Sequence, residues 1–316
     1  MSKELFLWPH AAPMRARHFL TGHPGHAALE ARLRRLYPAA EPVLFSSARA
    51  GLRATLAALG LGRPDLVWCP PYSSHCVFDA IARLATPCTL PDCAPTAALI
   101  YHQWGFVHRH DFPASVTVIE DAVDTLLRPG ASPFAAGGRY ALWSLPKVIA
   151  SHWGGVVFCR DAEDAEALRR QRDASPVQRH LQALLRLAGD RHLRAGQYWH
   201  GVESTGGPLP GFALNHIDQQ LQQLPAIFSQ VQDQLARCRS LSLLAYERDD
   251  RLPCNLPVPA ELDKVELSGI RLTAGLRAFN LALTAPRCDW QRVLPLPIHL
   301  ETIGTNLADI LASSNH

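Results

Sequence analysis

The sequence predicts an α/β protein, with a mostly parallel central sheet covered by helices and a smaller C-terminal α+β region. Short apolar runs of β type alternate with helix patterns through the first half, which is typical of parallel sheets with helices on both faces. The chain has 316 residues, 47% hydrophobic and 19% charged, enough for one large domain and a smaller one. We expect the large domain at residues 1–200 and the small domain at residues 201–316.

Five apolar runs in the first half are expected to be strands, at residues 42–45, 66–68, 97–101, 116–119 and 155–158. Three segments whose apolar residues have helical spacing are expected to be helices, at residues 51–59, 77–84 and 161–172. Polar residues follow several of these strands, among them Ser46, His102 and Asp121. Because ligand sites in parallel sheets form beyond the carboxyl ends of the strands, these positions predict a site.

The second half has a different pattern. Segments rich in Gln, Leu and Arg at residues 177–193 and 217–244 indicate helices, and the Gly/Pro-rich stretch at 203–211 indicates a linker between them. Prolines interrupt the chain from Arg251 onward, and a last helix is expected near the end. These features predict the smaller α+β region.

Composition and charge argue against several classes of function. The net charge is +3 with no basic run longer than a pair, so we expect no nucleic-acid partner. We also expect no membrane partner and a cytoplasmic protein, since we find neither an apolar run of membrane-spanning length nor a signal peptide. The eight cysteines and fifteen histidines are dispersed, which favours reduced cysteines and no metal site.

Lys147 is the residue that most needs a reason, because lysine is rare in this chain. Of 31 Lys and Arg residues only Lys3, Lys147 and Lys264 are lysine, and Lys147 lies inside the apolar stretch 140–150. A desolvated lysine can lose its proton and attack a carbonyl group, which arginine cannot do. The alternative is a lysine that extends its charge to the surface.

Two further features match such a lysine. Asp121 closes the run 116–119 and can pair with a protonated ring nitrogen, although an aspartate there can also be a turn residue. Ser46, Ser47 and Ala48 precede a helix, where backbone N–H groups can bind a phosphate, although serines there can also be plain N-caps. An imine-forming lysine, a carboxylate for a ring nitrogen and a phosphate cradle are what pyridoxal 5'-phosphate (PLP) requires.

Eight segments occur in one order along the chain, at residues 45–52 (FSSARAGL), 70–81 (PPYSSHCVFDAI), 102–105 (HQWG), 118–122 (VIEDA), 144–147 (SLPK), 154–155 (GG), 211–215 (GFALN) and 294–299 (LPLPIH). In these segments the chain resembles the DegT/DnrJ/EryC1/StrS aminotransferases, over roughly residues 40–310. The resemblance implies a fold-type-I PLP-transferase that forms a homodimer and aminates a keto-sugar.

The resemblance also implies a role for individual residues. Lys147 would hold PLP as a Schiff base and Asp121 would pair with its ring nitrogen, which makes these two the catalytic residues. Asn215 would reach the cofactor of the neighbouring subunit, so the active site would lie at the dimer interface. The full set of cofactor-binding residues implied is Ser47, Ala48, Arg49, Ser74, Asp121, Asp124, Ser144, Lys147 and Asn215.

Some positions depart from the family pattern. Asp124 stands where the family usually has Gln or His beside the phenolic oxygen of the cofactor, and two negative charges there would repel unless one is protonated. Ser74 stands where an aromatic residue often stacks on the ring, leaving Tyr72, His75 or Trp104 as substitutes. Pro146 replaces a Ser or Thr, and the segments before Ile100 and before Lys147 are short, as in a trimmed family member.

The function expected is transfer of an amino group from an amino acid, with glutamate as the donor, to a keto-sugar, nucleotide-linked in most of the family. Two alternatives stay open. One is a PLP-dependent sugar dehydratase, although those enzymes typically have histidine at the position of Lys147. The other is a homologue without catalysis that acts as a binding or scaffold subunit, which the departures at Ser74 and Asp124 suggest. The arginine-rich composition suits a bacterial source and envelope polysaccharide or natural-product biosynthesis.

Overall fold

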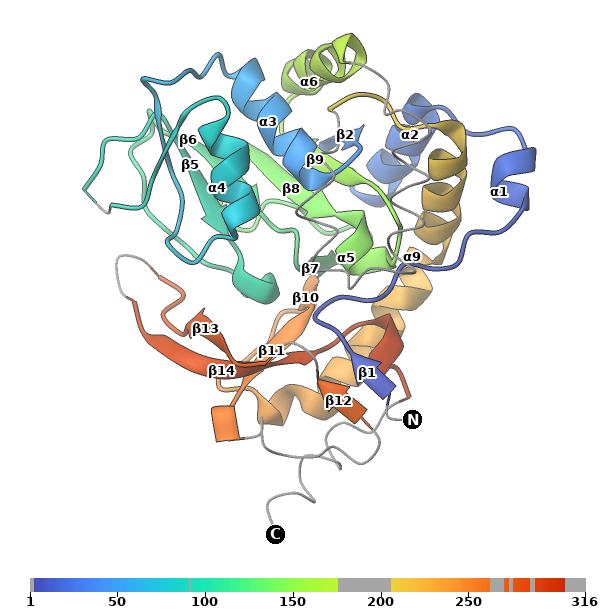
Figure 1. Ribbon diagram of the computed structural model, residues 1–316, viewed down its shortest axis with the longest axis vertical. Helices are drawn as coiled ribbons and strands as arrows, with labels where there is room; N and C mark the ends of the chain where they lie inside the picture. The colour runs from blue at the N-terminus through green and yellow to red at the C-terminus, as the bar shows by residue number, and fades with distance from the viewer. Residues whose placement is uncertain are drawn as a thin grey trace.

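The main sheet has seven strands, and its order sets the position of the site (Figure 1). The computed structural model describes residues 3–90, 92–175, 206–261, 270–272, 275–284 and 288–304. Across the sheet the strands are β2 (Glu41–Phe45), β9 (Gly155–Cys159), β8 (Tyr140–Ser144), β6 (Thr117–Asp121), β5 (Ala97–Tyr101), β3 (Leu66–Trp68) and β4 (Thr86–Cys88). The five strands expected from apolar runs are all present, and β8 and β4 are additional.

Most of the neighbouring strands run in the same direction. The β8–β6, β6–β5, β5–β3 and β3–β4 pairs are parallel, whereas β9 is antiparallel to both β2 and β8. Strand β9 therefore begins at the edge where its neighbours end. The expected α/β class with a mostly parallel sheet is confirmed.

Helices cover both faces of this sheet, which explains its long apolar runs. On one face lie α3 (Ala48–Ala58), α4 (His75–Ala82) and α6 (Ala162–Ala174), whose residues join one buried cluster. On the other face lie α2 (His26–Leu36) and α9 (Gly211–Cys238), whose residues join a second cluster. The strands alternate between the clusters, as Leu142 and Trp143 of β8 show.

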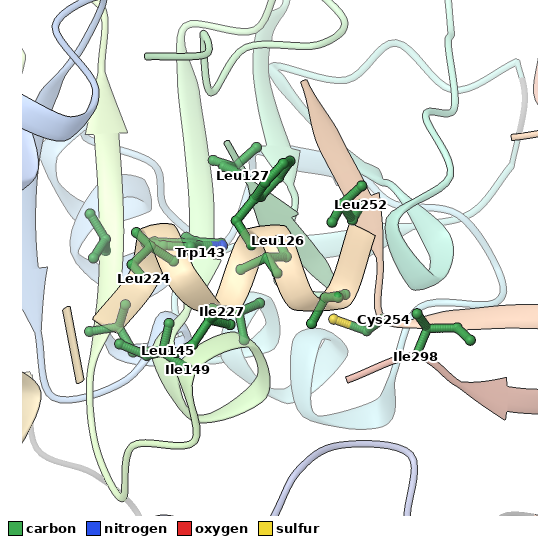
Figure 2. Close-up of a cluster of buried hydrophobic side chains, with 14 of the residues drawn as sticks. Leu126, Leu127, Trp143, Leu145, Ile149, Leu224, Ile227, Leu252, Cys254 and Ile298 are labelled. Carbon is green, nitrogen blue, oxygen red and sulfur yellow. The ribbon is translucent and has the colours of Figure 1, made fainter. Parts of the chain in front are cut away.

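Helix α9 forms the centre of the second cluster. Its apolar residues recur at helical spacing along one face, with Leu224 and Ile227 buried in a cluster that includes Trp143 of β8 and the side chains of α5 (Figure 2). The helix starts before the expected residue 217, because Phe212 and Leu214 already belong to the buried stripe. It ends at Cys238, before the expected residue 244, and the short 3-10 helix η2 (Arg239–Leu241) follows it.

A second, three-stranded antiparallel sheet lies below the main sheet in Figure 1. Its strands are β11 (Asn255–Val258), β14 (Trp290–Pro297) and β13 (Arg277–Asn280). Two short ladders complete the strands, β1 (Lys3–Leu5) with β12 (Ile270–Leu272) and β7 (Thr125–Leu127) with β10 (Arg251–Pro253). The remaining helical elements of the described residues are α1 (Arg17–Leu20), α5 (Leu145–Ile149), η1 (Gln103–Gly105) and η4 (Leu300–Thr302).

Three expectations lie outside the described residues. They are the helix at 177–193, the last helix near the C-terminus and the domain boundary at residues 200 and 201. The division into two domains at that boundary stays a prediction.

Candidate active site

The candidate site lies at the carboxyl edge of the main sheet. Asp121 is the last residue of β6, and it pairs in register with Tyr101, the last residue of the parallel neighbour β5. Asp124 follows in the short connection from β6 to β7, and Lys147 lies on α5, directly after β8. Because β5, β6 and β8 are consecutive in the sheet, their ends bring these residues to one place.

Lys147 is held by a short helix whose other face is anchored in the core. Helix α5 follows Ser144, its N-cap residue, and has Pro146 within its first turn, where proline suits helix initiation. Leu145 and Ile149 are fully buried beside α9 (Figure 2). Lys147 itself keeps 24% of its side chain exposed. The apolar stretch around it is therefore β8 followed by one helical turn.

Asp124 is the partner of Lys147. Its carboxylate has no exposed surface, and its Oδ1 lies 2.9 Å from Nζ of Lys147. Oδ1 also accepts a hydrogen bond of 2.9 Å from Nε1 of Trp8, and Oδ2 accepts one from the hydroxyl of Tyr101. The structure thus places Asp124 against the lysine and surrounds its buried charge with donors, as a buried carboxylate requires.

The charges at this edge shift each other's pKa. Burial opposes the charged form of Lys147, but the adjacent Asp124, with help from Asp121, raises the lysine pKa above its ordinary value. Burial raises the pKa of Asp121 to about 7, a rise that Lys147 opposes and Asp124 increases. Lys147 is therefore an ammonium at neutral pH in this state, whereas Asp121 titrates near neutrality.

The start of α3 lies at the same edge of the sheet. Ser47 is its N-cap, and its hydroxyl accepts a 3.1 Å hydrogen bond from the backbone nitrogen of Ala50. Gly155 at the start of β9 pairs with Ser144 of β8 and packs on the helix start. A Cβ on Gly155 would lie 2.0 Å from the nitrogen of Ala48, so the close approach requires glycine.

Two of the predicted cofactor residues have their described contacts elsewhere. Ser74 is the N-cap residue of α4, and its hydroxyl lies 3.2 Å from Sγ of Cys76. Asn215, in the first turns of α9, donates a 2.9 Å hydrogen bond to the carbonyl of His18. Arg49 lies in the first turn of α3, beside Ala48. The role of Asn215 toward a second subunit stays a prediction.

The candidates for ring stacking also differ in their surroundings. Trp104 is 7% exposed and packs on Phe279 at 4.7 Å between ring centroids, so it belongs to the core. The hydroxyl of Tyr72 is 3.2 Å from Nδ1 of His108, and the Tyr72 ring lies 6.1 Å from that of Tyr101. Tyr72 is thus in ring contact with a residue that binds Asp124.

The structure adds three residues that sequence reasoning did not include. Trp8 and Tyr101 both donate to Asp124, and Sγ of Cys254 lies 3.9 Å from the carbonyl oxygen of Lys147. Tyr101 could have been found from the sequence, because it closes the apolar run beside the strand of Asp121. Trp8 and Cys254 reach the site from distant parts of the chain, and no local pattern marks them.

Among the described residues, no group of three or more His, Cys, Asp or Glu side chains is arranged to hold a metal ion. None of the described helices is long and apolar enough to span a membrane.

The chain belongs to a family of PLP-dependent aminotransferases. A family model described as "Putative PLP-dependent aminotransferase" matches residues 29–314. None of the curated proteins matches the chain.

Solved structures share the fold at low sequence identity. A DegT/DnrJ/EryC1/StrS aminotransferase from Brucella abortus has a TM-score of 0.61 at 13% identity, covering 94% of this chain and 91% of its own. The PLP form of the "Putative sugar aminotransferase Spr1654" from Streptococcus pneumoniae has a TM-score of 0.63 at 14% identity, covering 96% and 97%. DesI with its TDP-sugar product has a TM-score of 0.58 at 17% identity, covering 98% and 91%. The resemblance inferred from the motifs is thus confirmed in the fold.

The chemistry of the edge residues fits PLP. Asp121 is a buried carboxylate whose described hydrogen bond, from the nitrogen of Val123, is long at 3.3 Å, which leaves it able to pair with a cationic ring nitrogen. Lys147 would supply the amine, and the start of α3, packed on Gly155, is the kind of N-terminus that binds a phosphate. We therefore take the cofactor to be PLP.

Proposed function

We propose that this enzyme transfers an amino group from an amino acid, with glutamate as the donor, to the keto group of a nucleotide-linked sugar, with Lys147 and Asp121 as its catalytic residues. The observation that carries the proposal is the buried cluster of Lys147, Asp124 and Asp121 at the carboxyl edge of the sheet. The nucleotide-linked sugar is supported by the family resemblance and by the fold shared with DesI, which was solved with a TDP-sugar product.

PLP, when bound, supplies an electron sink that stabilises negative charge on the carbon losing its proton. Lys147 holds the cofactor through its amine and, once released, accepts the proton from the α-carbon of the donor at Nζ. Asp121 stays ionised beside a cationic ring nitrogen, because that charge offsets the burial that otherwise raises its pKa to about 7.

Asp124 is the ion-pair partner of the protonated, unreactive form of Lys147. An ammonium cannot attack a carbonyl, so Lys147 must lose a proton before it binds the cofactor. Oδ1 of Asp124 is 2.9 Å from Nζ, so Asp124 holds the ammonium in position until that proton is lost.

The remaining assignments are also proposals. Backbone groups at Ala48 and Arg49, with Ser47 and Ser144, would hold the phosphate at the start of α3. We propose a homodimer with the active site at its interface and Asn215 directed to the neighbouring cofactor, as the family resemblance implies. The division at residues 200 and 201 belongs to the same proposal.

The test is the visible absorption spectrum of the purified protein with PLP, followed by borohydride reduction and peptide mass spectrometry. We expect a protein-bound band, loss of that band on adding glutamate, and PLP attached to Lys147 after reduction. Lys147→Ala should abolish all three, whereas the matched variant Lys264→Ala should retain them. A folded wild-type protein that binds no PLP would overturn the proposal and favour a binding or scaffold subunit.

The substrate is tested separately, with a panel of nucleotide-linked and free keto-sugars added to the glutamate-treated enzyme. Amine transfer to a nucleotide-linked member restores the original absorption band. If only free keto-sugars or keto acids restore it, the proposed substrate class is wrong while the assignment of Lys147 stands.

A further inference from the structure

The N-terminal segment, residues 6–12, is fastened to the C-terminal part of the described chain. The carbonyl oxygen of Phe6 accepts a hydrogen bond of 2.9 Å from Nε2 of His299. The backbone nitrogen of His10 donates to Glu301 at 3.1 Å, and its ring nitrogen lies 2.8 Å from the same carboxylate. Just before this segment, β1 pairs with β12.

The other end of the segment is fastened to the helix that carries Lys147. The nitrogen of Ala12 donates a 2.7 Å hydrogen bond to the carbonyl of Ala150. Ala150 ends α5 in the left-handed region, with a φ of 54°. The segment therefore spans from the C-terminal residues to the end of α5, with Trp8 between its two attachments.

Trp8 contacts both members of the buried ion pair. Its Nε1 donates to Oδ1 of Asp124 at 2.9 Å, the same oxygen that lies 2.9 Å from Nζ of Lys147. The Lys147 Nζ also lies over the face of the Trp8 ring, 4.3 Å from its centroid. A cation at this distance from an indole face is attracted by the ring quadrupole, whereas a neutral amine is not.

We propose that Trp8 is a positioning residue for Lys147, which holds the lysine ammonium against Asp124 and makes the N-terminal segment one wall of the active site. This inference rests on the proposed function, because it gives Trp8 a role only through the cofactor lysine. The PLP-binding residues carried over from the family resemblance do not include Trp8.

The groups that face Lys147 determine whether replacing Trp8 raises or lowers the lysine pKa. Asp124 and Asp121 favour the ammonium, and the partly buried Cys76 and the buried Cys254 also face this site. Burial opposes the charged form. Replacing Trp8 by an aliphatic residue removes the cation–π contact, which lowers the lysine pKa, and admits water, which raises it.

The two possible roles of Trp8 therefore predict opposite shifts. If Trp8 holds the charge of Lys147, Trp8→Leu lowers the lysine pKa by up to about one unit, the size expected from a partly desolvated cation–π contact. If Trp8 only keeps water out, Trp8→Leu raises the pKa, because Lys147 becomes better hydrated. A purely structural side chain therefore cannot give the result that a positioning residue gives.

The experiment measures the pKa of Lys147 in the PLP-free protein by competitive acetylation against N-acetyl-lysine amide across a range of pH. Peptide mass spectrometry reads Lys147 directly, since the chain contains only two other lysines, Lys3 and Lys264. We expect a lower midpoint in Trp8→Leu and a midpoint near wild type in Trp8→Phe, which keeps a ring face. An unchanged or raised midpoint in Trp8→Leu would overturn the proposal, as would equal midpoints in the two variants.

Three controls define the scale. Asp124→Asn removes the ion pair and should lower the midpoint further than any change at Trp8. Tyr101→Phe removes the other donor of Asp124 but no ring face over the lysine, so it should not lower the midpoint. Trp290→Leu removes a tryptophan that is 41% exposed and should leave the midpoint unchanged. Trp8→Met replaces Trp8→Leu if the latter does not fold.

Failure of this inference is distinguishable from failure of the proposed function. The acetylation midpoints are measured without PLP, so they test Trp8 whatever the cofactor does. Attachment of PLP to Lys147 in the wild type tests the proposed function whatever the midpoint of Trp8→Leu.

Discussion

Gly155 packs so closely on Ala48 that a Cβ at position 155 would lie 2.0 Å from the Ala48 nitrogen and 2.2 Å from the carbonyl carbon of Ser47. The contact joins the first residue of β9 to the first turn of α3. Because both partners are backbone atoms, neither can move as a flexible side chain would. The proposed phosphate-binding turn can therefore lie this close to β9 only because residue 155 has no side chain.

We expect Gly155→Ala to displace the start of α3. Overpacking of this kind typically costs about 1–3 kcal/mol. Because the added Cβ would clash with backbone, we expect the free energy of unfolding to fall by about 3 kcal/mol, the upper end of that range. Affinity for PLP should fall with it, because the displaced turn is the proposed phosphate site. Urea unfolding and a PLP titration measure the two effects. Gly22→Ala is the matched control, since a Cβ there meets nothing within 4 Å. Wild-type stability in Gly155→Ala would contradict the close contact.

Asp121→Asn is expected to stabilise the PLP-free protein at neutral pH. Burial raises the pKa of Asp121 to about 7, above its ordinary value of 3.8. Between these values the folded state holds a proton that the unfolded state has lost, so this group makes the wild type less stable as the pH rises from about 4 to 7. The stability difference between variant and wild type should therefore be near zero at pH 4 and largest above pH 7, as measured by urea unfolding at each pH. A difference independent of pH would contradict the raised pKa.

Asp250→Asn is expected to change the stability at neutral pH in the opposite direction to Asp121→Asn, as measured by the same urea unfolding. Partial burial resists ionisation of Asp250, but the hydrogen bond from Arg248 and the charge of Arg251 outweigh it and lower its pKa to about 2. Its contribution to stability is present above the unfolded-state pKa and is lost as the pH falls toward 2. Asp250→Asn should therefore destabilise the protein at neutral pH, and by less as the pH falls.

Glu120→Gln is expected to destabilise the fold strongly. The Glu120 carboxylate has no exposed surface. It accepts from Nε2 of His102 at 2.9 Å and from the backbone nitrogens of Ala135, Ala136 and Gly138 at 2.7, 3.0 and 2.7 Å. An amide would turn two hydrogens toward these donors, and breaking a buried pair of this kind costs about 3–5 kcal/mol. The loss should appear in urea unfolding and in the melting temperature.

An exposed ion pair serves as the control for that loss. Asp79 and Arg83 face each other on α4 at 3.0 Å, with about half of each side chain exposed. Asp79→Asn should cost less than about 1 kcal/mol, the usual range of surface pairs. Similar losses in Glu120→Gln and Asp79→Asn would show that the Glu120 network contributes little.

The main sheet could be predicted largely from the sequence, because strands buried on both faces appear as uninterrupted apolar runs. Residues 97–101 and 155–158 are such runs, and the structure has β5 and β9 there. Strand β8 could not be separated from its surroundings, because Tyr140–Ser144 continues without a polar break into α5. In a short apolar stretch the periods of strand and helix cannot be told apart.

The candidate site was predictable only where a local feature marks its residues. Asp121 closes an apolar run, and Lys147 is one of only three lysines in the chain. The order of β6 and β8 in the sheet then brings the two together. Trp8 is 116 positions from Asp124, and its contact depends on how the N-terminal segment is fastened to residues at the other end of the chain. Spacing rules describe one helix, one strand or one turn, and they do not reach across such a separation.

The position of Trp8 makes the beginning of the chain chemically sensitive. An aminopeptidase that removed the first eight residues would leave every strand of the main sheet in place, because β2 begins only at Glu41. It would nevertheless remove the indole that contacts Asp124 and Lys147. A preparation that has lost Trp8 in this way is therefore expected to differ little from the intact protein in circular dichroism, apart from the loss of the short strand β1, but to differ in lysine reactivity. The intact mass of each preparation should be recorded before its chemistry is compared.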